Sequence, residues 1–192
     1  MDKLNRLITK RLVLNEIKLS DAEAFYELFS NDAVLKYYDV NKFTDIQNAY
    51  DLIERIQYKF NHQIGYRYAI RLKSENSHQS LPENLIGSFG VNRIIEVDGE
   101  YGVAIGYDLH PNHWQKGYMS EVLSQILIEL KSKLLFEKKI SFVFAEVYDG
   151  NEQSKNVLLK QGFHRAESDV AEQIRWNLEI TERQIFKLDL NR

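Results

Sequence analysis

The sequence of 192 residues contains no cysteine. This absence excludes disulfide bridges, thiolate metal sites and a cysteine nucleophile. A group transfer by this protein must therefore be direct, or must use an oxygen or nitrogen nucleophile. The Gly-x-Ser-x-Gly motif of the α/β-hydrolases and the Walker A phosphate loop are absent as well, which argues against both classes of enzyme.

Long apolar runs and an excess of basic charge are also missing. No apolar run approaches the roughly 20 residues that span a bilayer, and Met1–Arg6 lacks the apolar stretch of a signal peptide. We therefore expect a cytoplasmic protein with no membrane partner. The net charge of −3 provides no broad basic field for nucleic acid. The length and the 44% hydrophobic content predict a single domain, residues 1–192, with a sizeable core.

The hydrophobic pattern predicts alternating strands and helices. Asp98–Gly99 favours a type I′ hairpin turn, and Lys73–Asn84 is polar enough to be a surface loop. Expected strands cover residues 7–17, 66–72, 85–95, 101–109 and 140–148, followed by a last hairpin of 174–178 and 183–190. Expected helices begin at Ser20 or Asp21, at Thr44 or Asp45, at Ser120 (ending at Leu135), and at Asn151 or Ser154 (ending at Gly162).

This order of elements predicts an α/β protein with a mixed sheet and helices on its faces. The strand over 101–109, the helix over 120–135 and the strand over 140–148 form one unit. A right-handed crossover makes its two strands parallel. Ligands of such sheets bind near the carboxyl ends of the strands.

The first candidate site is the entrance to the helix that follows the strand over 101–109. Gln115, Lys116, Gly117 and Tyr118 lie there. The first N–H groups of a helix lack internal partners and carry partial positive charge. Gly117 permits close approach of a ligand, and Lys116 adds a full charge. The pattern indicates a pyrophosphate site, although an ordinary strand-to-helix turn has the same appearance.

The second candidate site is the end of the strand over 140–148. Glu146 shares one face of this strand with Phe144 and Tyr148. Desolvation among aromatic side chains would raise the pKa of Glu146 toward that of a useful base, although a solvated glutamate remains the alternative. Asn151 and Ser154 at the following turn can form hydrogen bonds, and Ser154 could equally be a helix cap.

Two further patterns have competing interpretations. Asp108, His110 and His113 have the spacing of a metal triplet and suggest a metal hydrolase as a rival. Because Pro111 interrupts the segment, we expect no metal. An aromatic loop lines an acceptor pocket in one interpretation and forms a satellite core in the other; its residues are Tyr37, Tyr38 and Phe43.

Several segments together resemble the GNAT superfamily of acetyl-CoA dependent N-acetyltransferases, and most of all its RimJ/RimL branch, the ribosomal-protein N-acetyltransferases. The resemblance covers about Leu7–Phe163. It rests on the order and spacing of the segments Thr9–Leu14, Ala104–Tyr107, Trp114–Glu121, Asn151–Ser154 and Lys160–Phe163. The superfamily's Arg/Gln-x-x-Gly-x-Gly/Ala loop corresponds to Trp114–Met119, with Gly117 matched and both end positions different.

The resemblance implies a fold and a set of residues that bind the coenzyme. The fold is the GNAT fold: a mostly antiparallel mixed sheet of about seven strands, with parallel strands four and five splayed apart and helices on both faces. Asn151 would contact the pantetheine arm. Backbone groups would hold the rest of acetyl-CoA, which is a co-substrate and needs no metal; they belong to Leu109, Gln115, Lys116, Gly117, Tyr118, Met119 and Ser120.

The resemblance also directs the choice of catalytic residues. Relatives of this branch commonly carry a glutamate on strand four, where this chain has Ala104. Members of the superfamily often carry a tyrosine as the general acid, where this chain has Leu158. Glu146 is therefore the first choice for the base, with Asp108 and Glu100 as fallbacks. Ser154 is the first choice for the acid.

The implied reaction is direct transfer of an acetyl group to a primary amine in a ternary complex. The expected acceptor is a protein or peptide N-terminus, and a small amine or antibiotic is the alternative. A non-catalytic acyl-CoA-binding module remains a rival, because Ala104 and Leu158 replace usual catalytic groups. The resemblance also implies that a homodimer could form.

Overall fold

The computed structural model describes residues 4–38, 40–73, 85–178 and 183–190. Most of the predicted loop over Lys73–Asn84 lies outside these residues. The chain forms two compact units, one of residues 1–90 and 107–122 and the other of residues 91–106 and 123–192.

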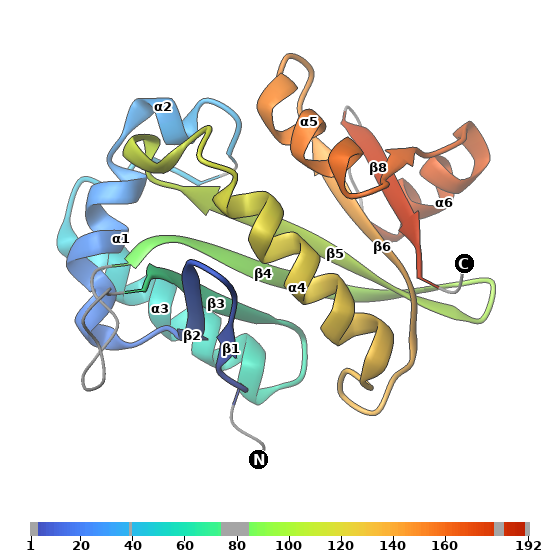
Figure 1. Ribbon diagram of the computed structural model, residues 1–192, viewed down its shortest axis with the longest axis horizontal. Coiled ribbons are helices and arrows are strands. Elements are labelled where there is room, and N and C mark those ends of the chain that lie inside the picture. The colour runs from blue at the N-terminus through green and yellow to red at the C-terminus, as the bar shows by residue number, and fades with distance from the viewer. Residues whose placement is uncertain (1–3, 39, 74–84, 179–182, 191–192) are drawn as a thin grey trace. The chain divides into compact units, whose positions relative to one another are not determined.

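The described residues contain eight strands in one sheet, in the order β1-β2-β3-β4-β5-β6-β8-β7 (Figure 1). Their bounds are β1 Leu7–Ile8, β2 Leu12–Glu16, β3 Tyr66–Leu72, β4 Leu85–Val97, β5 Glu100–Leu109, β6 Ile140–Val147, β7 His164–Arg165 and β8 Gln184–Asp189. The helices are α1 Ala22–Phe29, α2 Asp32–Leu35, α3 Ile46–Asn61, α4 Tyr118–Ser132, α5 Glu152–Lys160 and α6 Ser168–Leu178.

The parallel pair is the one that the sequence predicts. The ladder between β5 and β6 begins with Tyr101 opposite Ile140 and ends with Ala104 opposite Phe144. Both strands continue beyond its end, to Leu109 and Val147. The pairs β1–β2, β2–β3, β6–β8 and β7–β8 are antiparallel. The mostly antiparallel mixed sheet of the GNAT fold is thereby confirmed.

Local signals placed several boundaries correctly. Asp45 caps α3 by accepting a hydrogen bond from the N–H of Gln47. Asp98 and Gly99 both have positive φ, as a type I′ turn requires. Gly162 has φ of 86° after the end of α5, the backbone conformation in which glycine ends helices.

Two predicted strands are wrong. The expected strand over 7–17 is a hairpin of β1 and β2, because the chain turns at Thr9, whose hydroxyl accepts a hydrogen bond from the N–H of Leu12. The expected last hairpin does not form, because residues 174–178 belong to helix α6. Ile174 and Ala171 pack on β6 and β8, and this burial along one face of a helix outweighs the β-propensity of a short apolar run.

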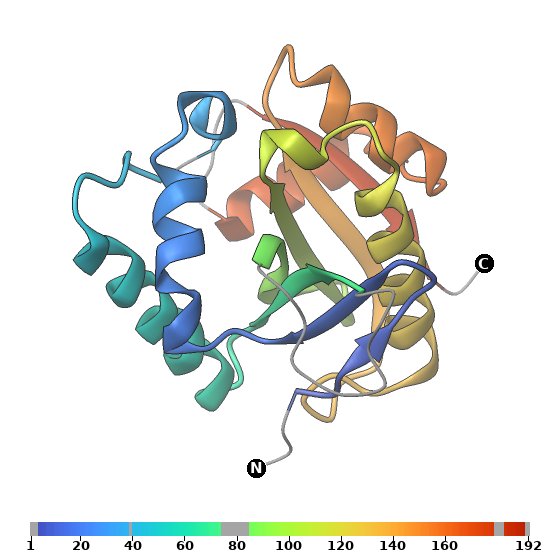
Figure 2. The ribbon, with the colours of Figure 1, turned by 60° about the vertical axis from the view of Figure 1, so that its left-hand side comes forward.

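The core of the first unit lies beneath α1 and α3, which pack side by side (Figure 2). Phe25, Phe29 and Ile53 are almost fully buried there. Phe43 is 5% exposed and belongs to the same cluster, against which Tyr38 packs. The interpretation of the aromatic loop as core is therefore correct for these two residues.

Candidate functional site

The turn that precedes α4 has an unusual backbone. Gln115 has φ of 59° and Gly117 has φ of 75°, so two residues of this short turn adopt the left-handed conformation. A side chain at Gly117 would be strained by that φ. A Cβ there would lie 3.5 Å from the Arg11 Nη2 atom, with no other close neighbour. Around the Cβ position of Gly117, the described residues therefore place no close atom other than Arg11 Nη2.

Neighbouring side chains hold this turn against the end of β5. The Trp114 indole donates a 2.7 Å hydrogen bond to the carbonyl oxygen of Leu109, so this oxygen already has a protein partner. Met119, which replaces a small residue of the family loop, is only 6% exposed. Its bulk is accommodated inside the protein and does not cover the turn.

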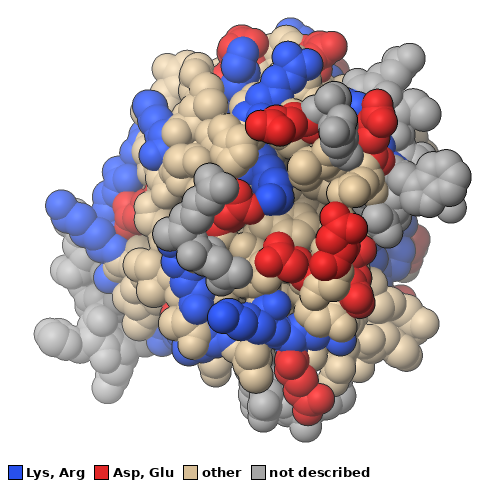
Figure 3. Space-filling model, turned by 90° about the vertical axis from the view of Figure 1, so that its right-hand side faces the viewer, with Lys and Arg blue, Asp and Glu red and all other residues tan. Residues whose placement is uncertain are grey.

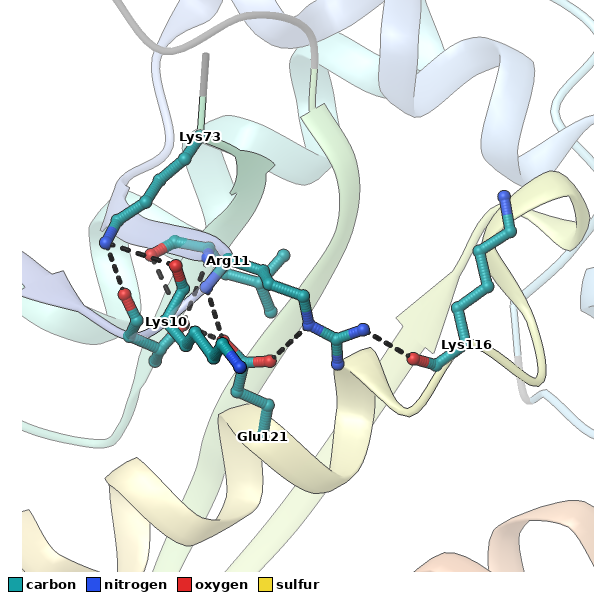
Figure 4. A network of polar contacts seen from close by, with 7 residues as sticks. Lys10, Arg11, Lys73, Lys116 and Glu121 are labelled. Carbon is teal, nitrogen blue, oxygen red and sulfur yellow. Dashed lines mark hydrogen bonds and ion pairs between the residues drawn. The ribbon is translucent and has the colours of Figure 1, made fainter. Parts of the chain in front are cut away.

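An ion-pair network links the β1–β2 turn to α4 (Figure 4). The Arg11 backbone N–H donates to Oε1 of Glu121, and Arg11 Nε donates to Oε2, each at a distance of 2.7 Å. Arg11 also donates from Nη1 to the carbonyl oxygen of Lys116 over 2.9 Å. The Thr9 hydroxyl donates to Glu121, and the Arg11 guanidinium lies 4.5 Å from the centre of the Tyr118 ring.

The network sets the charge state of Glu121. Burial raises the pKa of this carboxyl, but hydrogen bonds from Thr9 and Arg11 and the positive charge of Arg11 outweigh it. The pKa of Glu121 is therefore held below its ordinary value. An ionised Glu121 is thus part of the structure that supports the turn.

A second network is buried at the end of β5. The Asp108 carboxylate accepts hydrogen bonds from the Ser88 N–H and hydroxyl, from Arg67 Nη1 and from the Tyr38 hydroxyl. The Asp108 side chain is 1% exposed and the Arg67 side chain 12%. Burial raises the pKa of the Tyr38 hydroxyl, which keeps it a donor. All these contacts give Asp108, a fallback base, a structural role.

In the second unit, Glu146 lies near the end of β6 as predicted, with an unexpected partner. Its Oε2 accepts a 2.9 Å hydrogen bond from Arg183 Nη1, and both side chains are about one-fifth exposed. The Arg183 guanidinium also lies 4.4 Å from the centre of the Tyr148 ring. This positive charge stabilises the ionised carboxylate, so it opposes the desolvation among aromatic side chains that the sequence suggested.

The sequence left open whether Asn151 or Ser154 is the cap of α5. Asn151 is the N-cap of α5, and its Oδ1 accepts a 3.2 Å hydrogen bond from the Ser154 N–H. Ser154 therefore lies in the first turn of the helix and is not its cap. Its hydroxyl keeps the candidate role of proton donor.

The positions where relatives carry catalytic groups are apolar here. Ala104 is 5% exposed and packs with Phe142 and Phe144, and Leu158 is fully buried. Glu100, the other fallback base, begins β5, next to the residue that pairs with Ile140 at the start of β6. At about 3.3 Å per residue, Glu100 lies roughly 20 Å from the Glu146 end of β6.

Of the two histidines of the apparent metal triplet, His110 has local partners, whereas the buried Nδ1 of His113 has no hydrogen-bond partner among the described residues. His110 Nδ1 accepts from the Asn112 N–H, and its Nε2 lies 3.8 Å from Glu27. Burial is the main factor that lowers the pKa of His113, with smaller contributions from Lys116 and His110. The described residues contain no group of three or more His, Asp or Glu side chains that could hold a metal ion.

Sequence reasoning missed the three arginines that organise these sites. Arg11 was visible as part of the Thr9–Leu14 segment, and its charge was a signal that was not used. Arg67 and Arg183 gave no local signal, because each pairs with a carboxylate about 40 residues away.

The surface and the helices add two general observations. On the face shown in Figure 3, basic side chains are interspersed with acidic ones. Among the described residues, no helix has both the length and the apolar character required to cross a membrane.

Comparison with known proteins identifies the family. The family model "Acetyltransferase (GNAT) domain" matches residues 11–164. An uncharacterized N-acetyltransferase of Bacillus subtilis strain 168, YoaA, is 32% identical over 159 residues, covering 83% of this chain and 82% of YoaA. This chain also shares its fold with two solved acetyltransferases.

One is RimL, a ribosomal L7/L12 alpha-N-protein acetyltransferase in complex with coenzyme A, with TM-score 0.73, 14% identity and coverage of 96% of this chain and 98% of RimL. The other is MccE, a microcin C7 self-immunity acetyltransferase in complex with acetyl-CoA and AMP, with TM-score 0.71, 17% identity and coverage of 94% and 93%. This chain therefore belongs to the GNAT acetyltransferase family and is an acetyl-CoA dependent N-acetyltransferase.

Proposed function

We propose that this enzyme, acting as one domain, transfers the acetyl group of acetyl-CoA directly to the α-amino group of a protein or peptide in a ternary complex. The observation that carries the proposal is the turn at the start of α4, with its two left-handed residues and little protein around the Cβ position of Gly117. Since the chain has no cysteine, an acetyl-cysteine intermediate is impossible.

The turn supplies the chemistry that a diphosphate needs. Backbone N–H groups of Gln115–Ser120 would donate to the phosphate oxygens, and Gly117 leaves space for close approach. Lys116 adds a point charge. Leu109 and Asn151 would contact the pantetheine arm, Leu109 through its backbone.

Glu146 and Ser154 would carry the proton transfers. The amine attacks the thioester carbonyl, a C–N bond forms, and the C–S bond then breaks. Glu146 takes the proton that the amine loses, and the Ser154 hydroxyl, as the acid, donates its proton to the departing thiolate and regains one from solvent. The ion pair with Arg183 holds Glu146 in the ionised form that can accept a proton, and it also weakens this carboxylate as a base.

The acceptor class is supported by likeness alone. RimL acts on a protein α-amino group, and MccE confers immunity to a microcin. A small amine or an antibiotic is therefore the second candidate.

A thiol-release assay with acetyl-CoA over peptides, polyamines and aminoglycosides tests the proposal. We expect the highest kcat/KM for a peptide with a free N-terminus and none for the same peptide with a blocked N-terminus. A higher kcat/KM for polyamines or aminoglycosides would show that the acceptor is a small amine or an antibiotic instead of a protein N-terminus. Binding of acetyl-CoA by calorimetry without turnover on any amine would favour a binding module.

A further inference from the structure

We propose that Arg11 is a positioning residue for acetyl-CoA: it fixes the orientation of the Lys116–Gly117 peptide group in the turn before α4. The inference rests on the proposed role of this turn in holding the diphosphate. It adds a residue more than 100 positions away in the sequence, on the β1–β2 turn, to the binding machinery.

The geometry of the peptide group is the first step. The Lys116 carbonyl oxygen accepts a 2.9 Å hydrogen bond from Arg11 Nη1. The structure has no cis peptide bond among the described residues, and in a planar trans peptide the C=O and the N–H point in opposite directions. Arg11 therefore aims the Gly117 N–H away from itself. A reversed peptide group would present an oxygen to the phosphates and repel them.

The anchoring of Arg11 is the second step. Glu121, in the first turn of α4, binds both the backbone N–H and the Nε of Arg11. The guanidinium also lies over the Tyr118 ring. Lys73 donates to the carbonyl oxygens of Thr9 and Lys10, which ties the β1–β2 turn to the end of β3. The planar guanidinium is thus fixed before a ligand arrives.

The charge balance is the third step. Because Glu121 neutralises Arg11, the contribution of Arg11 to binding is orientation more than attraction. The Lys116 ammonium instead extends away from Arg11 and Glu121 (Figure 4). The two cations have separate roles: Lys116 offers charge, and Arg11 presents a backbone donor.

The test compares two acetyl donors. Acetyl-CoA carries the diphosphate, and acetyl-pantetheine ends before it. We expect Arg11→Met to raise KM for acetyl-CoA about 10- to 100-fold, the loss of one charge-assisted hydrogen bond and the order it imposes. The kcat of Arg11→Met should stay within about twofold of the wild type. Its kcat/KM with acetyl-pantetheine should also stay within about twofold, because that donor never contacts the turn. Lys10→Met, which removes an exposed charge from the same turn, is the matched control and should leave both donors unaffected.

Each outcome is decisive. An unchanged KM for acetyl-CoA in Arg11→Met, or an equal loss on both donors, overturns the inference. If Arg11→Met does not fold, Arg11→Lys serves instead: a lysine can still pair with Glu121 but cannot also reach the Lys116 carbonyl in a fork. Arg11→Lys should show the same selective rise in KM for acetyl-CoA. An equal change from the wild type with both donors would overturn the inference. If the wild type fails to bind acetyl-CoA in calorimetry, the proposed function itself fails, and this result is separate from any variant.

Discussion

The starts of α4 and α5 follow the same local plan and are completed in different ways. Each helix follows a turn at the end of a strand. The α5 start is closed by its own side chain, since Asn151 caps the Ser154 N–H. The residue before α4 is Gly117, which has no side chain with which to cap. Residues of the distant β1–β2 turn support it instead.

The difference supports the proposed division of the site between the two corners. A helix start capped by its own asparagine has satisfied part of its donor capacity. A helix start with glycine at the cap position has no side chain that could occupy these donors. We therefore propose that the diphosphate binds at the α4 start and that proton transfer takes place at the corner of Glu146 and α5.

The sharpest test of this division is Glu146→Gln, which keeps the shape of the side chain and removes its basicity. We expect kcat to fall about 100- to 10,000-fold, while calorimetry gives an unchanged Kd for acetyl-CoA. Glu152→Gln, an exposed carboxylate in the first turn of α5, is the control and should retain its kcat. A normal kcat in Glu146→Gln would remove this residue from the mechanism.

The buried network beside β5 predicts a large effect on stability. Arg67→Met leaves the Asp108 carboxylate buried without its cation, which should lower the free energy of unfolding by about 3–5 kcal/mol in urea titrations. Arg93→Met, at an exposed position of β4, should change it by less than about 0.5 kcal/mol. Adding Asp108→Asn to Arg67→Met should recover part of the loss; no recovery would show that packing, not charge, explains it.

A comparison of two glycines with similar backbone conformations separates the cost of backbone strain from an effect on acetyl-CoA binding. Gly117 and Gly99 have φ of 75° and 79°, so alanine at either position should cost about 1 kcal/mol of folding stability. Only Gly117→Ala should also weaken acetyl-CoA binding, by about tenfold, because its Cβ intrudes on the phosphate position. The measurements are urea unfolding and calorimetry, and equal affinities for the two variants would argue against the turn as the binding site.

The helix caps offer a smaller comparison of the same kind. Asn151 caps α5 by accepting a hydrogen bond from the Ser154 N–H, and Asn31 caps α2 by accepting one from the Ala33 N–H. Alanine at either position should lower Tm by about 2–4 °C, since a cap contributes about 1 kcal/mol. Only Asn151→Ala should also raise KM for acetyl-CoA. If Asn31→Ala raises it equally, the proposed pantetheine contact is wrong.

The smallest predicted effect is the acid dependence of stability. The folded-state pKa of Glu121 lies below its ordinary value of 4.5. Its ionised form therefore stabilises the fold above that pH, and this stabilisation is lost as the pH falls through the folded-state pKa. Urea unfolding between about pH 3 and 5 should show a shallower pH dependence for Glu121→Gln than for the wild type. Identical slopes would show that Glu121 does not contribute.

Local patterns allowed much of the fold to be predicted. The limits of β3 and β5, the cap at Asp45, the turn at Asp98–Gly99 and the end of α5 near Gly162 follow from short-range signals. The parallel β5–β6 pair follows from the handedness of a crossover connection. These features succeed because a few neighbouring residues decide each of them.

The predictions failed where distant residues compete with local preference. Residues 174–178 have a strand-like composition, but their burial against β6 and β8 makes them helical. The arginine partners of Asp108, Glu121 and Glu146 lie roughly 40 to 110 positions away. The sequence by itself determined most of the elements and turns, and its motifs indicated the family. Only the tertiary structure decided which charges meet, because ion pairs depend on distance in space, and no local pattern records that distance.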